Sequence, residues 1–267
     1  MRYEIDLTKY RWILVNSSAG KDSQTALRRV VHECRRQGVP LSRVVVSHQD
    51  LGRMEWPGVK KLAWDQARHY GLRFEVSKYR NKEGIEYSLL DYVLRRGKWP
   101  DNNNRWCTSD FKRGPGRRII TRLSREAPGR MLLVFGFRAE ESPARRKKEP
   151  FVTALPKVTT KSRVVDQWLP IHDWTLKQVW DDIRDSGVPY HYAYDLGMPR
   201  LSCVFCIFAP FDALVLAGKH NPELLQEYVD VEARVGHTFK NGESIVSVQE
   251  AVKNNKTIGD LHGAWNM

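Results

Sequence analysis

Small and polar residues between an apolar run and a helical pattern form the first stretch of the sequence that could do chemistry. The apolar run 12–15 predicts a buried strand, and residues 24–36 carry apolar side chains at helical spacing. Backbone N–H groups in such a turn can surround an anion at the positive end of a helix, while Ser17 and Ser23 add hydroxyl donors and Lys21 adds a charge. The turn therefore predicts a phosphate loop. The alternative is a small-residue turn that only caps the helix.

Cysteines are the second group of residues with chemical potential. Cys107 has cationic neighbours, which favour a thiolate, and Cys203 and Cys206 form a C-x-x-C pair. By itself the pair is compatible with zinc, a redox dithiol or two core thiols. With Cys107 it supplies three thiolates, enough to hold an iron–sulfur cubane with one iron left open to another ligand. The fourth cysteine, Cys34, is interpreted as a plain residue of the first helix.

Cations after a later apolar run form a third group. Residues 130–135 predict a strand, and Gly136 would let the backbone turn tightly where that strand ends. Arg138 is then placed to clamp phosphate oxygens, and Arg145 adds a second cation. The following run, 146–148, is either a solvated charge cluster or part of a path for a nucleic-acid backbone.

The elements that must position these groups alternate along the chain. Further strands are expected at 43–47 and 74–77, and helices at 59–70 and 81–94. Thr175 is expected to cap another helix, and the tail contains helical patterns near 212–216, 223–235 and 247–253. Crossovers of this kind predict a parallel sheet with ligands beyond the carboxyl ends of its strands, where Asp50 is also expected.

Composition limits the classes of protein that fit. The chain has 267 residues with 41% hydrophobic content, enough for an α/β core. It shows no long apolar span and no secretory signal, so a cytoplasmic protein without a membrane partner is expected. The formal net charge of +13 suits either a polyanionic partner or only a self-repelling soluble surface.

Five ordered motifs between Val15 and Cys206 carry a family resemblance. They are Ser-x-Gly-Lys-Asp-Ser at 18–23, Arg-x-Cys with Lys-x-x-Pro at 105–115, Gly-x-Arg-x-x-Glu-Ser-x-x-Arg at 136–145, Pro-Ile-x-Asp-Trp-Thr at 170–175, and the C-x-x-C pair. Together they resemble the phosphoadenosine phosphosulfate (PAPS) reductase-like branch of the PP-loop ATP pyrophosphatase superfamily, also called adenine nucleotide alpha hydrolases.

The resemblance implies a fold, a domain plan and a set of site residues. The fold is α/β, a Rossmann-like, doubly wound and mainly parallel sheet, with a nucleotide-binding domain at 1–206 and a helical extension at 207–267. Members of the superfamily split ATP between its α and β phosphates, so ATP and Mg²⁺ are expected, the metal at Asp22. The implied catalytic residues are Lys21, Asp22, Arg138 and Arg145. The implied nucleotide-binding residues are Ser17, Ser18, Gly20, Ser23, Asp50 and Gly136.

The cysteines depart from the pattern of the related reductases. Assimilatory adenylyl-sulfate reductases carry a Cys-Cys…Cys-x-x-Cys cluster, but Thr108 stands at the second position of the first pair here. A 4Fe-4S cluster with three cysteine ligands, Cys107, Cys203 and Cys206, is therefore expected. Reductases also carry a C-terminal Glu-Cys-Gly-Leu-His motif, for which residues 260–263 are no substitute.

Three functions follow as hypotheses. The first is an ATP pyrophosphatase that adenylylates an acceptor for sulfur incorporation, most similar in its motifs to the enzyme of bacterial DNA phosphorothioation. Its partners would be DNA and a sulfur donor such as a cysteine desulfurase, and an oligomer is left open. The second is reduction of adenylyl sulfate or PAPS. The third is a non-catalytic nucleotide-binding subunit of a DNA-processing assembly.

Overall fold

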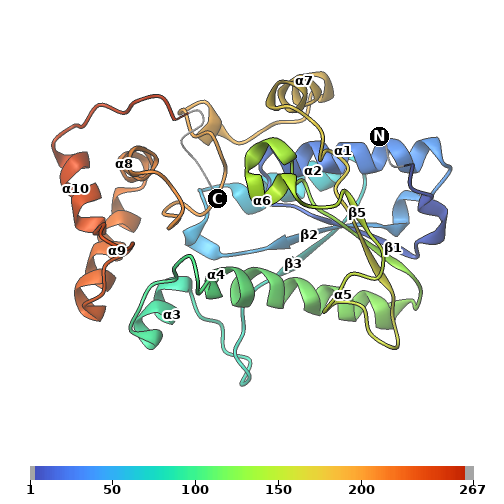
Figure 1. Ribbon diagram of the computed structural model, residues 1–267, viewed down its shortest axis with the longest axis horizontal. Coiled ribbons are helices and arrows are strands. Elements are labelled where there is room, and N and C mark those ends of the chain that lie inside the picture. Colours follow the sequence, from blue (N-terminus) through green and yellow to red (C-terminus); the bar gives the residue numbers. More distant parts are fainter. Residues whose placement is uncertain (1–3, 262–267) are drawn as a thin grey trace.

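A computed structural model describes residues 4–261 of the chain. Six strands form one sheet (Figure 1). They are β1 (Trp12–Asn16), β2 (Val44–Gln49), β3 (Arg73–Ser77), β4 (Met131–Val134), β5 (Phe151–Val152) and β6 (Val165–Trp168). The helices are α1 (Lys21–Arg36), α2 (Val59–His69), α3 (Leu89–Arg96), α4 (Trp106–Thr108), α5 (Gly114–Glu126), α6 (Pro143–Arg146), α7 (Leu176–Ser186), α8 (Phe211–His220), α9 (Pro222–Val235) and α10 (Ile245–Lys253).

The strand order is β3-β2-β1-β4-β6-β5. All neighbouring pairs are parallel except β5 with β6, which is antiparallel. The chain leaves β1 toward β2 on one side and later returns to pair β4 on the other side, so the order reverses between β1 and β4. Ligands of such sheets bind at this switch point. The expectation of a doubly wound, mainly parallel sheet is confirmed.

Alternation along the central strands explains the two covering layers. Ile13 and Val15 of β1 belong to an apolar cluster with α1 and α7, whereas Trp12 and Leu14 belong to a cluster with α5. Successive side chains of a strand point to opposite faces, so a strand buried on both faces needs a continuous apolar run. Figure 1 shows α1, α2 and α7 on one side of the sheet and α5 on the other.

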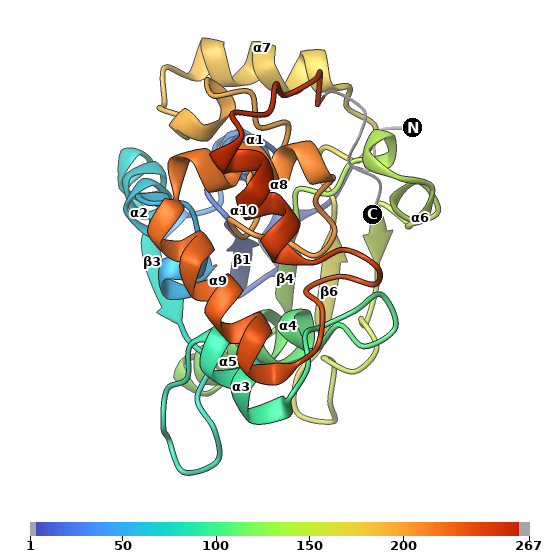
Figure 2. The same cartoon turned by 90° about the vertical axis from the view of Figure 1, so that its left-hand side faces the viewer.

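A third apolar cluster lies beyond the carboxyl ends of the strands, where α8, α9 and α10 cover them (Figure 2). It joins residues that follow β1 and β2, among them Ala19 and Met54, to α3 and to the three C-terminal helices. Segments near 212–216, 223–235 and 247–253 are helical as expected. Residues 262–267 of the expected extension lie outside the described residues. No helix within residues 4–261 combines the length and the hydropathy that a membrane span requires.

Two local expectations differ from the structure. The helix expected over 81–94 begins only at Leu89, because Asn81 Oδ1 accepts a hydrogen bond from the Ile85 backbone N–H (2.8 Å) and holds a turn before it. Ser88 then caps α3 in a reciprocal pair with Asp91. The short strands β5 and β6 were not expected, since their few residues carry little periodic signal. The cap that Thr175 provides for α7 is confirmed.

Candidate nucleotide and cysteine site

The phosphate loop connects β1 to α1 and is closed by its own side chains. Ser17 Oγ accepts a hydrogen bond from the Ala19 backbone N–H (3.1 Å), and Ala19 has a left-handed φ of 57°. Ser23 Oγ donates to the Gly20 carbonyl (2.9 Å) and accepts from the Ser18 backbone N–H (3.2 Å). The loop therefore leads directly into the first turn of α1, whose positive dipole end favours an anion.

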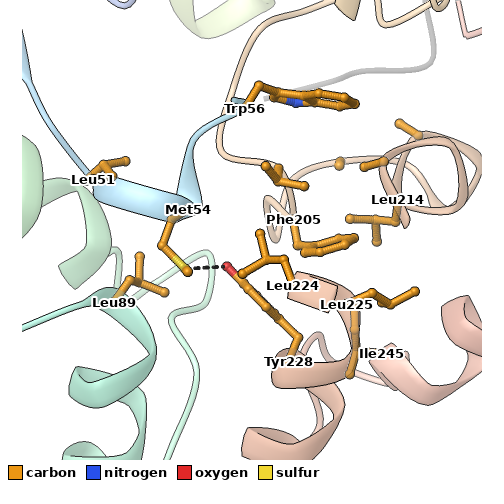
Figure 3. Packing of buried hydrophobic residues seen from close by; sticks show 14 of the residues in the cluster. Leu51, Met54, Trp56, Leu89, Phe205, Leu214, Leu224, Leu225, Tyr228 and Ile245 are labelled. Carbon is orange, nitrogen blue, oxygen red and sulfur yellow. Dashed lines mark hydrogen bonds between the residues drawn. The ribbon is translucent and has the colours of Figure 1, made fainter. Parts of the chain in front are cut away.

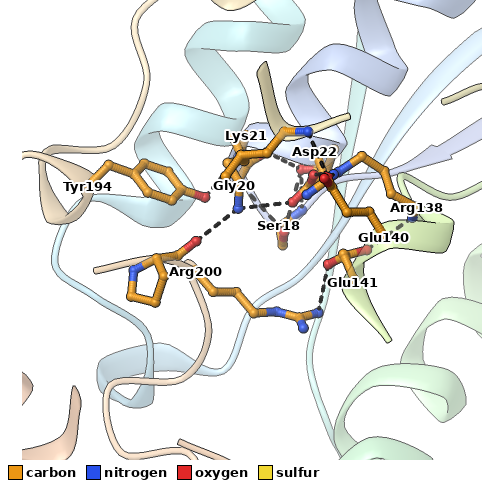
Figure 4. A network of polar contacts seen from close by, with 12 residues as sticks. Ser18, Gly20, Lys21, Asp22, Arg138, Glu140, Glu141, Tyr194 and Arg200 are labelled. Atoms are coloured by element: carbon orange, nitrogen blue, oxygen red, sulfur yellow. Dashed lines mark hydrogen bonds and ion pairs between the residues drawn. The ribbon is translucent and has the colours of Figure 1, made fainter. Parts of the chain in front are cut away.

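Lys21 and Asp22 stand at the head of α1 and meet Arg138 from the segment after β4 (Figure 4). Arg138 Nε donates to Asp22 Oδ1 (2.6 Å), and Lys21 Nζ lies 3.3 Å from Asp22 Oδ2. Lys21 is also anchored at both ends: its backbone N–H donates to Tyr194 Oη and its Nζ to the Pro199 carbonyl, each at 2.9 Å. Residues that are far apart in the sequence therefore meet at the N-terminal end of α1.

Charge pairing sets the protonation of this group. Burial alone would raise the pKa of Asp22, but the positive charges of Lys21 and Arg138 bring it below its ordinary value. Arg138 is only 4% exposed, and although burial works against its charge, the Asp22 carboxylate raises its pKa. Lys21 and Arg138 thus keep Asp22 ionised next to the predicted phosphate loop, and Arg138 also pairs with Glu140.

A second charged group borders the first. Glu141 forms ion pairs with Arg145 and, at 3.6 Å, with Arg200, and it accepts a hydrogen bond from the Arg138 backbone N–H (3.0 Å). The Arg145 guanidinium lies 4.5 Å from the centre of the Phe137 ring. Burial and the charge of Arg200 lower the pKa of Arg145. One carboxylate thus holds two guanidinium groups together, an arrangement that leaves excess positive charge for an anionic ligand.

Gly136 brings β4 and α1 into close contact. A Cβ atom at this position would lie 2.3 Å from the Asp22 carbonyl oxygen and 2.9 Å from the Ser23 backbone nitrogen. These distances are far shorter than van der Waals contact. Only glycine therefore allows the segment that carries Arg138 to reach the head of α1.

One cavity of about 540 Å³ lies at the switch point of the sheet, and of the charged residues above it is lined by Asp22, Glu141, Arg145 and Arg200, but not by Lys21 or Arg138. Its volume is in the usual range for small-molecule sites. Phosphate-loop residues form one wall, and residues after β4 form another. A third wall comes from the segment that follows Cys107. Residues that line the cavity include Ser17, Ser18, Gly20, Asp22, Ser23, Thr108, Lys112, Arg113, Arg117, Gly136, Glu141, Arg145, Lys148, Lys157, Tyr194 and Arg200.

The three site cysteines pack against the C-terminal apolar cluster. Cys107 belongs to α4, which continues through a π-helical turn into α5. Cys203 pairs with Glu55 in an isolated antiparallel bridge, and Cys206 follows in the same loop. All three thiols are free and partly buried, whereas Cys34 is fully buried in α1 against the sheet. Cys34 therefore lies in a different core cluster from the other three.

Lys112 links the cysteines electrostatically to the cavity that it lines. The nearby thiol of Cys203, followed by those of Cys206 and Cys107, raises the pKa of Lys112. Burial raises the pKa of each of the three thiols, to about 11 for Cys203. Lys112 is exposed, and it is close enough to the three sulfur atoms for their charges to interact.

Within residues 4–261, no three His, Cys, Asp or Glu side chains converge on one point that could hold a single metal ion. A four-iron cubane binds its ligands on different iron atoms, so its thiolates need not meet at one point. Three free thiols on one apolar wall, next to Lys112, suit such a cluster, because soft sulfur ligands select iron–sulfur centres or zinc. For magnesium, Asp22 offers one carboxylate that is already paired with two cations.

The chain matches the model of the phosphoadenosine phosphosulfate reductase domain over residues 13–209. It belongs to this family. A protein of Escherichia phage 186, named as an uncharacterized 37.8 kDa protein, is 27% identical over 58% of this chain and 46% of its own length. The adenosine 5'-phosphosulfate reductase of Allochromatium vinosum is 28% identical over 52% of this chain and 49% of its own length. The chain thus spans about half the length of these curated relatives.

Two solved structures of other proteins are similar to this family member. PAPS reductase from Candida auris, in a phosphate complex, is 17% identical, covers 74% of this chain and 83% of its own, and has a TM-score of 0.47. The U34-tRNA thiolase NcsA from Methanococcus maripaludis, with its 4Fe-4S cluster, is 12% identical, covers 97% of this chain and 79% of its own, and has a TM-score of 0.44.

Most residues expected at the site of this PAPS reductase family member lie together in the structure. Lys21 and Arg138 pair with Asp22 but do not line the cavity. Asp50 lies elsewhere, and its carboxylate pairs with Lys60 (3.0 Å) and Lys78 (3.6 Å) in a second groove of about 1230 Å³. Asp50 does not line the cavity of the phosphate loop. Of the basic run, Arg145 and Lys148 line that cavity, whereas Arg146 and Lys147 do not.

Sequence reasoning did not select several residues of the cavity. Glu141 and Lys112 lie inside the quoted motifs, so their spacing to Arg138 and Cys107 could have identified them. Tyr194 and Arg200 carried no such signal, because the loop 190–202 reaches the phosphate loop only through the fold. Thus contacts at large sequence separation complete the site.

Proposed function

We propose that this protein is an ATP pyrophosphatase that adenylylates an acceptor for sulfur incorporation, and that the acceptor is the DNA backbone. The observation that carries the proposal is the single cavity that the phosphate loop shares with Thr108 and Lys112, beside the three cysteines. Nucleotide activation and sulfur chemistry would then take place side by side. The family supports a nucleotide-dependent sulfur reaction, and the acceptor is our own inference.

The residues of the chain have separate tasks in this proposal. The loop and the head of α1 bind the β and γ phosphates, while Arg145 holds the α phosphate against the attacking oxygen. Arg138 does not line the cavity and acts through Asp22, whose carboxylate it holds. Attack at the α phosphorus breaks the bond to the bridging oxygen and releases diphosphate. A sulfur nucleophile at the hydrosulfide level then displaces AMP, which leaves with the acceptor oxygen.

The iron–sulfur cluster would be held by Cys107, Cys203 and Cys206. When bound, it supplies an iron that is open to an exogenous sulfur ligand. Lys112 lines the cavity and interacts electrostatically with these cysteines, so its charge can orient an anionic sulfur species toward the nucleotide. The sulfur itself would come from a donor such as a cysteine desulfurase.

Cations at the cavity mouth support a polyanionic acceptor. Four exposed cations line the cavity, namely Arg113, Arg117, Lys148 and Lys157. Among the described residues, their side chains make no ion pair or hydrogen bond, unlike Arg138 and Arg145. Unpaired cations beside a nucleotide site suit the phosphates of a nucleic-acid backbone, which such residues contact without regard to sequence.

A comparison of products tests the reaction. Anaerobically purified protein is incubated with ATP or with adenylyl sulfate, and diphosphate and sulfite are measured. Diphosphate from ATP without sulfite from adenylyl sulfate supports sulfur incorporation. The second candidate, reduction of adenylyl sulfate, is favoured by the names of four curated relatives, and sulfite formation would establish it. DNA binding without turnover of either nucleotide would instead indicate a non-catalytic subunit.

Salt dependence tests the acceptor. Binding to duplex DNA should weaken steeply with salt, and Arg117→Ala with Lys148→Ala should flatten the slope by about one unit per lost phosphate contact. Lys147→Ala is the matched control, because Lys147 neighbours Lys148 but does not line the cavity. Undetectable DNA binding at low salt would overturn the DNA acceptor and leave a small-molecule or protein acceptor.

A further inference from the structure

Tyr228 is a buried phenol in α9, outside the residues that match the family model. It is 1% exposed and stacks on Trp99 with ring centres 5.2 Å apart. Phe205 and Phe239 meet its ring from other sides, at 5.0 and 5.8 Å. Packing of this kind fixes the ring and therefore the direction of its O–H group.

The phenol hydroxyl has a weak partner. Its O–H donates to the thioether sulfur of Met54 at 3.4 Å (Figure 3). A thioether is a poor acceptor, whereas the O–H of a buried tyrosine usually finds a strong one. The hydroxyl of Tyr228 is thus held among apolar side chains, and it could donate to a stronger acceptor than the Met54 sulfur.

Met54 places this hydroxyl beside the C-x-x-C loop. The Met54 carbonyl accepts a hydrogen bond from the Val204 backbone N–H (2.9 Å), and the next residue, Glu55, pairs with Cys203. Phe205, whose ring contacts Tyr228, lies between the two cysteines in sequence. The three site cysteines all pack against the apolar cluster that contains Tyr228 and Met54.

We propose that Tyr228 donates a hydrogen bond to the sulfur of Cys203 when that cysteine holds the iron–sulfur cluster, and that this bond raises the reduction potential of the cluster. The inference rests on the cluster of the proposed function. A hydrogen bond to an anionic sulfur is stronger than one to a thioether, and it favours the more negative, reduced state. Tyr228 is thus a positioning and tuning residue contributed by the C-terminal helices.

Redox titration of anaerobically reconstituted protein tests the proposal. Iron content and visible absorption are measured first, and the midpoint potential is then compared between the wild type and Tyr228→Phe. At equal iron content, the variant should show about a tenfold lower ratio of reduced to oxidised cluster at a fixed poise, about 59 mV for one electron. Tyr10→Phe is the control, and its midpoint potential should match that of the wild type. Tyr10 is also a buried phenol, but it belongs to a different apolar cluster and donates to Asp166.

Met54→Leu is the second variant, and it tests the role of Tyr228 if the Tyr228→Phe protein does not hold iron. It removes the thioether and leaves the sulfur of Cys203 as the acceptor, so the potential should stay the same or rise. A fall in Met54→Leu, or an unchanged potential in an iron-loaded Tyr228→Phe, would overturn the role of Tyr228 and leave the proposed function intact. Wild-type protein that takes up no iron–sulfur cluster would instead overturn the cluster, and this inference with it.

Discussion

Single residues in this protein act through buried pairs of opposite charge. His48 Nδ1 lies 3.0 Å from the Ser17 carbonyl oxygen, which only accepts, so this nitrogen carries a proton. Its Nε2 lies 3.2 Å from Glu55 Oε2, also an acceptor when ionised. Acceptors on both sides of the ring favour the protonated imidazole, which connects the predicted phosphate loop to the residue that pairs with Cys203.

Stability should depend on pH through His48. Burial alone would lower the pKa of His48, but the Glu55 carboxylate, the Ser17 carbonyl and the charge of Asp50 raise it above 6.5. The stabilisation is then complete below pH 6.5 and is lost as pH rises through the folded-state value. Free energies of unfolding in urea between pH 6 and pH 8.5 should fall for the wild type, by at most about 1.4 kcal/mol per pH unit for one proton.

The same titration of His48→Gln provides the comparison. Glutamine can still donate to a carbonyl, but it has no charge to lose in this range. Its free energy of unfolding should therefore change less with pH than that of the wild type. Equal slopes for the two proteins would show that His48 is not charged in the fold.

Arg138 should be necessary for diphosphate release. Replacing it with alanine removes a hydrogen bond of 2.6 Å to Asp22 and leaves this carboxylate with Lys21. Hydrogen bonds to charged groups contribute roughly 1.5–3 kcal/mol, so the rate should fall at least about tenfold. Arg146→Ala, an exposed neighbour that does not contact Asp22, should retain the rate. Normal turnover in a folded Arg138→Ala protein would show that the pair with Asp22 is not needed for the reaction.

At the scale of elements, the contact between β4 and α1 decides whether the site can assemble. Gly136→Ala would place a methyl group 2.3 Å from the Asp22 carbonyl oxygen, so strand and helix must separate. Overpacking of this kind costs about 1–3 kcal/mol, and nucleotide affinity should fall with it. Both are measurable, by urea denaturation and by titration with a non-hydrolysable ATP analogue.

Gly116→Ala in α5 is the control for folding. A Cβ there has its nearest neighbour at 3.7 Å, an ordinary contact, and alanine in a helix interior gains about 0.5–1 kcal/mol over glycine. The two substitutions should therefore change stability in opposite directions. A destabilisation of the same size in both would show that space at Gly136 is not the cause.

At the scale of the whole molecule, the cysteines belong to the apolar cluster that holds the C-terminal helices. The clusters on the two faces of the sheet contain different residues. Loss of the proposed iron–sulfur cluster should therefore loosen α8–α10 before it affects β1, β2 or β4. Local unfolding of this kind is visible in amide hydrogen exchange.

Iron removal by an anaerobic chelator should therefore raise exchange in α9 while the central strands stay protected. Cys107→Ser should have the same effect because it removes a thiolate ligand, whereas Cys34→Ser should not, since Cys34 packs against the sheet. A uniform rise over the whole chain would show that the three core clusters unfold as one unit.

The sequence by itself determined the fold class, and it predicted the phosphate loop between β1 and α1. Continuous apolar runs such as 12–15 predict strands buried on both faces, and the small residues after them leave room for an anion. Local chemistry also identified the three site cysteines and Cys34 as the exception, because neighbouring cations and C-x-x-C spacing are readable without a fold. These signals all come from residues within a few positions of each other.

Only the tertiary structure decided which distant residues share the cavity. Asp50 follows a strand of the same sheet, yet it faces the other groove because Lys60 and Lys78 hold its carboxylate there. Arg200 reaches the cavity of the predicted phosphate loop from the C-terminal third of the chain, and Tyr228 from the same third reaches the loop that carries Cys203 and Cys206. Packing of side chains sets such contacts, and packing depends on shape and crossing geometry in three dimensions, which no spacing along the sequence encodes.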